Sequence, residues 1–409
     1  MRVINQLVMQ PTSFCNIDCR YCYLPDRSRR TVMSDATLEA TFREVLGSPL
    51  ADPRLLIVWS LGEPLSAPMS FYQKAFALAE KIKRNGTTVN HHFQTNGTLL
   101  NEEWCNFIQE NRVGIAVSID GPRELHNESR RTRGGGGTFD QAMRGIRLLQ
   151  EHHIDFGIIS VVSARTLDQP DLLFDFYEEN GFARVGLNVE EIDGANKHSS
   201  LECMDAERRF RQFMRQILLR FRSSSTVNYL REYRPDTVAV LRDASAKRAA
   251  IDPQRPGIVS VSVDGDFTLL GPELLGARDA RGDEFILGNF RRDSLASVLE
   301  SEKFLRQSSE VDEGIAACKS SCRYFAVCGG GPPSNKFFEN GSFASTETFY
   351  CRLMCQAIAD VTLETISERE SGWTRCNDDE RVSEDGSEPQ LNRQKGELSC
   401  GPIRSQRGN

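Results

Sequence analysis

The sequence predicts an α/β protein built around a mostly parallel sheet. Between residues 7 and 189, short apolar runs of strand length alternate with stretches whose apolar residues recur at helical spacing. The run at 55–59, Leu-Leu-Ile-Val-Trp, is apolar throughout, as expected for a strand buried on both faces of a parallel sheet. This alternation indicates a barrel or a doubly wound sheet, whose functional loops follow the carboxyl ends of the strands.

The predicted elements follow one another in a regular order. After a strand at 7–10, a helix at 37–46 begins behind the capping pair Ser34-Asp35. There follow a strand at 55–59, a helix at 69–84, a strand at 89–93, a helix at 101–111, a strand at 114–119, a helix at 139–152, a strand at 157–162, a helix at 171–180 and a strand at 184–189. A longer helix at 201–222 has one apolar face, which is typical of a helix that packs on a core.

The composition is that of a globular protein with room for two or three domains, since 39% of its 409 residues are hydrophobic and 26% are charged. No apolar run reaches the roughly 18 residues of a membrane span, and the amino terminus lacks a signal-peptide pattern. We therefore expect a cytoplasmic protein without a membrane partner. The net charge of −7, without a sustained basic stripe, argues against nucleic acid.

Most of the twelve cysteines form two groups, which in a reducing compartment indicates metal ligation rather than disulfides. The first group is Cys15, Cys19 and Cys22, in a loop with a proline at either border. Their spacing allows all three thiolates to face one centre. A structural zinc site would require a fourth thiolate, and the next cysteine is Cys105. A cluster held by three thiolates leaves one iron free to bind a small molecule.

With Tyr21 before its last cysteine, this stretch reads C-x3-C-x-aromatic-C and resembles the radical S-adenosylmethionine (SAM) superfamily. The resemblance implies a partial (β/α)6 barrel and a [4Fe-4S] cluster whose fourth iron binds SAM. It also implies SAM-binding residues in the loops after the strands, namely Gly62, Glu63, Pro64, Thr95, Asn96, Ser118, Asp120 and Arg130. Leu61 stands where the family usually has a glycine. Ser118 and Asp120 would contact the ribose, and on a strand they would face the same side.

The second cysteine group follows a predicted hairpin, whose strands at 258–263 and 267–270 flank a turn. The order of its cysteines resembles the C-terminal SPASM extension of peptide-modifying radical SAM enzymes. The resemblance implies one auxiliary [4Fe-4S] cluster, held by Cys318, Cys322, Cys328 and Cys351. A second, inner cluster is not expected, because Leu270 and Pro332 stand where that family has ligands. A structural zinc ion held by the same four thiolates stays open, since spacing does not separate the two.

The domain plan follows from these stretches. We expect a radical SAM barrel at 1–230, a linker or helical bridge at 231–256, a SPASM-like auxiliary cluster domain at 257–365 and a disordered polar tail at 366–409. Cys376 and Cys400 lie in this tail and are not expected to be ligands. Cys355, one helical turn after Cys351, is expected to be a buried helix cysteine rather than a ligand.

Several loop sequences narrow the resemblance to the cyclophane-forming peptide maturases of glycine-rich-repeat precursor systems. These loops lie at 10–15, 272–276, 325–336, 338–343 and 346–352. The resemblance implies that a 5′-deoxyadenosyl radical abstracts hydrogen from a side-chain β-carbon of a ribosomally made precursor peptide. The carbon radical then attacks an aromatic ring and closes a three-residue cyclophane. An electron donor such as flavodoxin or ferredoxin would reduce the SAM cluster.

Restoring the aromatic ring requires the loss of one electron and one proton, so the barrel mouth needs a base. The candidates are Glu273 after the hairpin, and Glu190 and Glu191 after the last barrel strand, where paired like charges would raise one pKa. Two other interpretations stay open. One is a sulfatase-maturating oxidase that forms formylglycine with the same architecture. The other is a metal-stabilised peptide-binding module whose cluster is only structural.

Overall fold

The computed structural model describes residues 3–233, 235–242, 257–279 and 282–366, which contain ten strands, twelve labelled α-helices and a further α-helical stretch at 358–366 after η4. The strands are β1 (Ile4–Met9), β2 (Ala51–Trp59), β3 (Thr88–Thr95), β4 (Gly114–Ser118), β5 (Gly157–Val162), β6 (Arg184–Val189), β7 (Tyr229–Leu230), β8 (Ile258–Val261), β9 (Asp266–Thr268) and β10 (Gly288–Asn289). The α-helices are α1 (Asp35–Leu46), α2 (Met69–Ile82), α3 (Glu102–Glu110), α4 (Arg123–Ser129), α5 (Phe139–Glu151), α6 (Pro170–Glu179), α7 (Ala206–Ser223), α8 (Pro235–Arg242), α9 (Leu295–Leu299), α10 (Glu302–Ser321), α11 (Phe325–Cys328) and α12 (Pro333–Asn340). Shorter helical turns are η1 (Pro64–Ser66), η2 (Thr166–Asp168), η3 (Pro272–Leu274) and the π-helical η4 (Cys351–Ala357).

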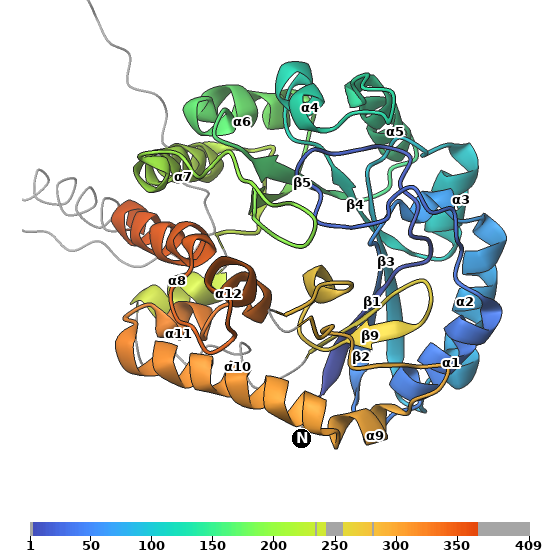
Figure 1. Cartoon of the computed structure of the whole chain (residues 1–409). Coiled ribbons are helices and arrows are strands. Elements are labelled where there is room, and N and C mark those ends of the chain that lie inside the picture. The colour runs from blue at the N-terminus through green and yellow to red at the C-terminus, as the bar shows by residue number, and fades with distance from the viewer. Residues whose placement is uncertain (1–2, 234, 243–256, 280–281, 367–409) are drawn as a thin grey trace, which may run out of the picture. The chain divides into compact units, whose positions relative to one another are not determined.

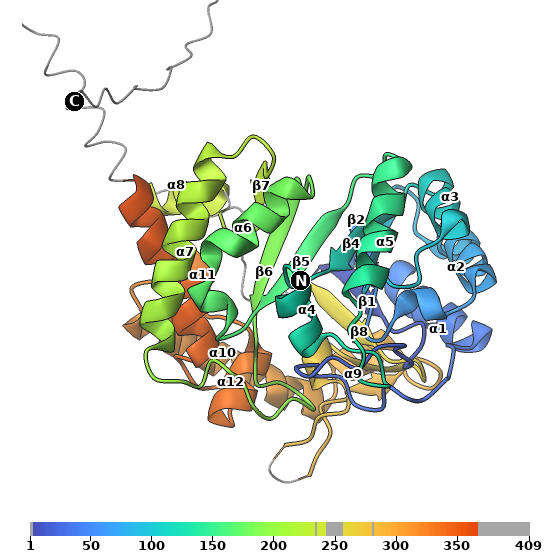
Figure 2. The same ribbon diagram turned by 90° about the horizontal axis from the view of Figure 1, so that it is seen from above.

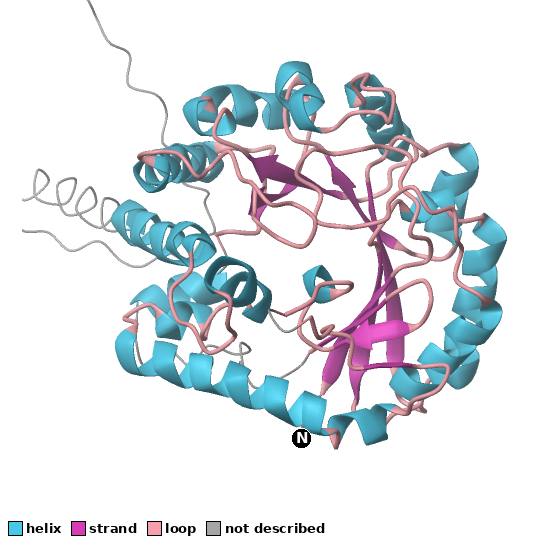
Figure 3. Cartoon of the chain, viewed as in Figure 1, coloured by secondary structure: helices cyan, strands magenta, loops and turns pink. Residues whose placement is uncertain are grey.

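The strands form one sheet in the order β10-β9-β8-β1-β2-β3-β4-β5-β6-β7. Neighbours from β8 through β1 to β7 run parallel, whereas β9 and β10 are antiparallel to their neighbours. Helices α1 to α6 cover the outer side of the curved sheet (Figures 1, 2 and 3). The predicted α/β class and the partial barrel of six strands, β1 to β6, are confirmed.

The periodic patterns of the sequence explain these elements. Ser34 caps α1 as predicted, because its hydroxyl accepts a hydrogen bond from the backbone N–H of Thr37 at 3.1 Å. Trp59 at the end of β2 is fully buried, and the rings of Phe71 and Tyr72 from α2 pack edge-on against it. A buried aromatic side chain of this kind stabilises a fold by roughly 1.5–3 kcal/mol.

The predicted hairpin continues the barrel sheet. Its first strand, β8, lies parallel to β1, with Gln6 opposite Ile258 and Met9 opposite Val261. Gly265, in the turn between β8 and β9, has a φ of +95°, a conformation that favours glycine. The hairpin is thereby fixed beside the strand that leads into the first cysteine group.

The C-terminal elements pack beside the barrel. Helix α10 begins at its cap Ser301 and carries Cys318 in its last turn, and η4 packs against α7. Residues 1–366 form one unit and residues 367–409 a second. The second unit, which contains Cys376 and Cys400, lies outside the described residues. Of the predicted linker, 235–242 form α8 and 243–256 lie outside the described residues. No helix in the described part of the chain is long and apolar enough to span a membrane.

Candidate functional site

A cavity of about 440 Å³ opens at the carboxyl ends of the barrel strands. The loop with Cys15, Cys19 and Cys22 forms one wall, and the loops after β2, β3 and β6 form others. Glu273 in η3 lines it as well, so that the residues after the hairpin close the cavity from the other side. The structure therefore brings both predicted halves of the site, the cysteine loop and the candidate bases, to one space.

Hydrogen bonds of the backbone hold the cysteine loop. The N–H of Cys15 donates to the carbonyl of Arg27 at 3.0 Å, and a guanidinium nitrogen of Arg27 donates to the carbonyl of Cys19 at 3.1 Å. Two side-chain donors face the thiols, since Nδ2 of Asn96 lies 3.8 Å from Sγ of Cys15 and Nη1 of Arg130 lies 3.9 Å from Sγ of Cys19. Burial raises the pKa of Cys15 to about 12 and that of Cys19 to about 11. A positively charged metal group would offset this and favour the thiolates.

The bend after β2 brings the backbone close to the cysteine loop. Gly62 has a φ of +145°, and a Cβ added there would lie 2.4 Å from the carbonyl oxygen of Thr12. Leu61, at the family's glycine position, adopts the left-handed conformation itself, with a φ of +64°. This costs a non-glycine residue roughly 1–2 kcal/mol. The side chain of Leu61 is buried with Val8 and Leu275, and this packing offsets the strain.

Glu63 ties the loops after β2 and β3 together. Its carboxylate accepts hydrogen bonds from the backbone N–H of Leu65 at 3.0 Å, the hydroxyl of Thr95 at 2.6 Å and the backbone N–H of Asn96 at 2.8 Å. Burial raises the pKa of Glu63 to about 7. Gly62, Glu63, Thr95 and Asn96 all line the cavity, whereas Pro64 is buried and its carbonyl accepts a hydrogen bond from a tyrosine hydroxyl of α2.

Asp120 lies behind the wall of the cavity. Its carboxylate accepts hydrogen bonds from the hydroxyl of Tyr21 at 2.5 Å and the N–H of Val161 at 3.0 Å, and it pairs with Nε of Arg130 at 3.0 Å. Ser118 and Arg130 line the cavity and Asp120 does not. Strand β4 ends at Ser118, so strand alternation does not extend to Asp120, and a shared side of the two residues is not tested. The ribose contact of Asp120 stays a prediction.

Three carboxyl groups, here called the acidic cluster, gather at the end of the cavity next to the hairpin: Glu191, Asp193 and Glu273. Burial raises the pKa of Glu273 to about 7 and that of Asp193 to about 6. The pKa of Glu191 lies well above its usual range because of burial and the neighbouring Asp193. Asn335 of α12 donates to Glu191 at 2.6 Å.

The two predicted glutamates after β6 differ in their surroundings. Glu190 lines the cavity too, but one of its carboxylate oxygens accepts a hydrogen bond from the N–H of Ser200 at 3.1 Å, which fixes the following loop. Asp193 was not predicted. The signal for it was a third acidic residue in the loop that follows the last barrel strand.

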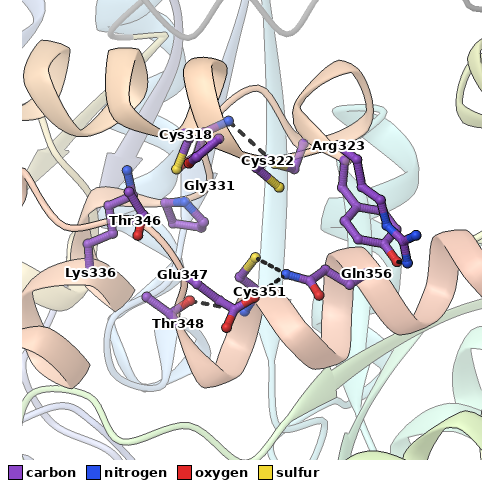
Figure 4. A pocket seen from close by; sticks show the side chains of 15 residues that line it. Cys318, Cys322, Arg323, Gly331, Lys336, Thr346, Glu347, Thr348, Cys351 and Gln356 are labelled. Atoms are coloured by element: carbon purple, nitrogen blue, oxygen red, sulfur yellow. Dashed lines mark hydrogen bonds between the residues drawn. The ribbon is translucent and has the colours of Figure 1, made fainter.

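The four predicted auxiliary ligands surround a second cavity, of about 220 Å³ (Figure 4). They are Cys318, Cys322, Cys328 and Cys351. The N–H of Gly330 donates to Sγ of Cys328 at 3.4 Å, and Nε2 of Gln356 donates to Sγ of Cys351 at 3.5 Å. Among the described residues, no three His, Cys, Asp or Glu side chains converge closely enough to hold a single metal ion.

Cys355, expected to be a buried helix cysteine, is half-buried and lies in η4. The neighbouring Cys328 and Cys351, together with burial, hold the pKa of Cys355 well above its usual range. Cys355 also borders a cavity together with Cys328 of α11.

Residues 9–177 match the model of the Radical SAM superfamily. The chain belongs to this superfamily. It is 37% identical over 369 residues to "Uncharacterized protein sll1766" of Synechocystis sp., which covers 89% of this chain and 92% of that protein. It is also 39% identical over 171 residues to the serine-type anaerobic sulfatase-maturating enzyme of Bacteroides thetaiotaomicron. That match covers 40% of this chain and only 41% of the enzyme.

Two solved radical SAM structures share the fold. Native anSMEcpe with bound AdoMet and Cp18Cys peptide aligns with a TM-score of 0.71 at 22% identity, covering 90% of this chain and 99% of that one. SuiB of Streptococcus suis bound to its precursor peptide SuiA aligns with a TM-score of 0.59 at 17% identity, covering 86% and 76%. At these identities the two likenesses show that the chain shares the fold of both proteins.

Proposed function

We propose that this radical SAM protein is a peptide maturase that joins a side-chain β-carbon of a ribosomally made precursor to an aromatic ring, closing a three-residue cyclophane. The observation that carries the proposal is that Cys15, Cys19 and Cys22 share one cavity with the buried acidic cluster. A radical source and a proton acceptor that border the same cavity are what this crosslink requires. A flavodoxin or ferredoxin is the proposed electron donor.

The cysteine loop fits the family's cofactors. Three thiols line the cavity, and the glycine at position 62 lets the bend after β2 pack directly against the backbone of the cysteine loop. Cys15, Cys19 and Cys22 would hold a [4Fe-4S] cluster, and Gly62, Glu63, Thr95, Asn96, Ser118 and Arg130 would contact SAM. When bound, cluster and SAM together supply the 5′-deoxyadenosyl radical. Asp120 holds Arg130 at the cavity wall, and its predicted contact with the SAM ribose is part of this proposal.

The acidic cluster is the proposed proton acceptor, with Glu273 as the base. A pKa of about 7 lets Glu273 accept a proton near neutral pH and still be ionised beforehand. Burial and the neighbouring Asp193 raise the pKa of Glu191 well above its usual range, and one oxygen of Asp193 has no hydrogen-bond partner among the described residues. Glu190 is the less suited candidate because Ser200 already occupies its carboxylate.

The second cysteine group supports one auxiliary cluster. Its cavity of about 220 Å³ is large for a single ion, so we propose a [4Fe-4S] cluster rather than zinc. At the positions where an inner cluster would have ligands, Leu270 packs beside Leu274 and Phe343, and Pro332 caps α12. Apolar packing thus takes the place of ligands. The auxiliary cluster, when bound, can accept an electron.

Formylglycine formation is the second candidate, and the sulfatase-maturating relatives favour it. Both reactions remove one hydrogen atom, one electron and one proton, so the barrel cavity suits either. A sulfatase-type substrate would supply its reacting Cys or Ser in place of an aromatic partner.

The test uses anaerobically reconstituted protein, a reductant, SAM and the peptide encoded beside the gene. Formation of 5′-deoxyadenosine supports an enzyme, and its absence supports a peptide-binding module. A product lighter by two hydrogens that does not react with an aldehyde reagent supports the cyclophane, whereas an aldehyde-reactive product supports formylglycine. Replacing Cys105, which is buried in α3, by Ala is the matched control for loss of a cysteine.

A further inference from the structure

Two side chains continue the sheet where its last strand stops. Strand β7 is only two residues long, and its last pair joins Leu230 to Val185 of β6. One step further along β6, the carboxylate of Glu232 accepts a hydrogen bond from the N–H of Leu187 at 3.1 Å, and the guanidinium of Arg231 donates to the carbonyl of Leu187. These side chains take the place of a strand at this edge of β6.

The guanidinium of Arg231 is held in one orientation. Its Nε donates to the carboxylate of Glu232 at 2.8 Å, and the side chain of Glu232 is buried. Gly186 leaves room for the guanidinium, because a Cβ at that position would lie 3.2 Å from its central carbon. The guanidinium therefore lies across β6 on the face that Gly186 shares with the residue two positions further on, Asn188.

This guanidinium determines which way the side-chain amide of Asn188 points. Nη2 of Arg231 lies 2.7 Å from Oδ1 of Asn188. Because a guanidinium only donates hydrogen bonds, the atom that faces it is the amide oxygen, and the NH2 group points away from it. Within the described residues this NH2 group donates to no acceptor. Asn188 thus has a donor of fixed orientation and no partner for it in the described chain.

Asn188 lies where three cavities meet. It lines the 440 Å³ cavity of the candidate site and two neighbouring cavities of about 450 and 490 Å³. Glu191 and Glu273 of the acidic cluster line the first two of these. The cysteine loop and the proposed SAM-binding residues line only the first. The amide of Asn188 is therefore placed on the side of the proposed base.

We propose that Asn188 is a substrate-binding residue, whose side-chain NH2 donates to a backbone carbonyl of the precursor peptide beside the residue that loses its β-hydrogen. The proposal deepens the proposed function and rests on it, since it requires a peptide in this cavity. The carboxyl groups of Glu191 and Glu273 disfavour an anionic acceptor at this end of the cavity. A peptide carries one neutral carbonyl per residue, so a donor of fixed orientation can set its position whatever its side chains.

The test measures the affinity of anaerobically reconstituted holoenzyme for the labelled peptide encoded beside the gene, by fluorescence anisotropy. Asn188→Asp keeps the oxygen that faces Arg231 and replaces only the donor, whereas Asn188→Ala removes both. Asn90→Asp, on an exposed position of β3, is the control for the added charge. We expect affinity to fall roughly three- to tenfold in Asn188→Ala. It should fall further in Asn188→Asp, whose second oxygen would face the peptide carbonyl. The KM for the peptide should rise by the same factors with kcat nearly unchanged.

A second measurement locates the contacted carbonyl. Synthetic peptides carry a thioamide at one peptide bond at a time, because sulfur is a weaker acceptor than oxygen. At the contacted position the thioamide should weaken binding to the wild type and have no further effect in Asn188→Ala, as expected when both changes remove the same hydrogen bond.

Three results would overturn the proposal. The first is equal peptide affinity in Asn188→Asp and Asn90→Asp. The second is a loss of SAM affinity in place of peptide affinity, which would assign the amide to the cofactor. The third is a set of thioamide effects that persist unchanged in Asn188→Ala at every position. Failure of the proposed function is distinguishable, since an aldehyde-reactive product would exclude the crosslink while the Asn188 variants still bind the peptide more weakly.

Discussion

Replacing Asp120 by Ala should destabilise the protein by about 3–5 kcal/mol, because it leaves a buried guanidinium without its carboxylate. The side chains of Asp120 and Arg130 are only 4% and 8% exposed, and the two groups lie 3.0 Å apart. The change also removes the acceptor of the Tyr21 hydroxyl and of the Val161 N–H. An unsatisfied buried donor adds roughly 1–3 kcal/mol, which places the expected loss in the upper part of the range.

The expected shift in melting temperature follows from the size of the folded unit. Unfolding residues 1–366 at about 2.1 cal/mol/K per residue gives an entropy near 0.8 kcal/mol/K, so 3–5 kcal/mol corresponds to about 4–7 °C. Thermal unfolding of the metal-free protein measures it. Asp140→Ala is the matched control, since Asp140 pairs with Arg123 at the surface and should shift the melting temperature by about 1 °C or less.

A double variant tests whether the unpaired Arg130 guanidinium, rather than a general loss of packing, causes the loss of stability. Asp120→Ala together with Arg130→Met removes both charges, so it should be more stable than Asp120→Ala alone. If the double variant melts below the single one, or if Asp120→Ala melts like Asp140→Ala, the buried ion pair does not stabilise the cavity wall as argued.

Four further outcomes are expected. Reconstituted protein should hold about eight irons, and the triple change of Cys15, Cys19 and Cys22 to Ala should leave about four and abolish SAM cleavage; twelve irons in the wild type would reveal an inner cluster. Glu273→Gln should retain 5′-deoxyadenosine formation while the crosslinked product falls, and an unchanged product rate would exclude Glu273 as the base. Leu61→Gly should have a free energy of unfolding roughly 1 kcal/mol higher than Leu61→Ala, because glycine relieves the left-handed backbone. Both variants lose buried packing relative to the wild type, and thermal unfolding compares them. The stability of the metal-free protein should fall as pH rises from about 4.5 to about 7, because the folded acidic cluster holds protons that the unfolded chain releases; Glu273→Gln should flatten this slope, as denaturant titrations at several pH values would show.

The barrel was predictable because its strands and helices follow simple periods. The predicted strands at 157–162 and 184–189 match β5 and β6 to the residue, since the first is mostly apolar and the second places an apolar residue at every other position. Helix α10, by contrast, was not predicted. Its sequence is mostly polar, with few apolar residues such as Phe304, and it is stabilised by packing in the folded protein rather than by its own pattern.

In the candidate site, too, local sequence patterns were predictive and contacts between distant segments were not. Both cysteine groups were recognised from the sequence, because most cysteines in each group lie only a few residues apart. The partners of Asp120 depend on contacts between segments as far apart as Tyr21 and Val161, which no local pattern encodes. Similarly, Asp193 reads as an ordinary loop acid until folding buries it beside Glu191.

The parallel pairing of β1 with β8 sets the order in which the protein can be completed during its synthesis. Strand β1 is made long before β8, so one of its edges stays open until residue 258 has left the ribosome. At roughly 5–20 residues per second, that interval is on the order of 12–50 s. Because β1 leads directly into the cysteine loop, a nascent chain has its thiols in place long before the wall that shields them. The cysteine loop therefore lacks this part of its surroundings until β8 has been added to the sheet.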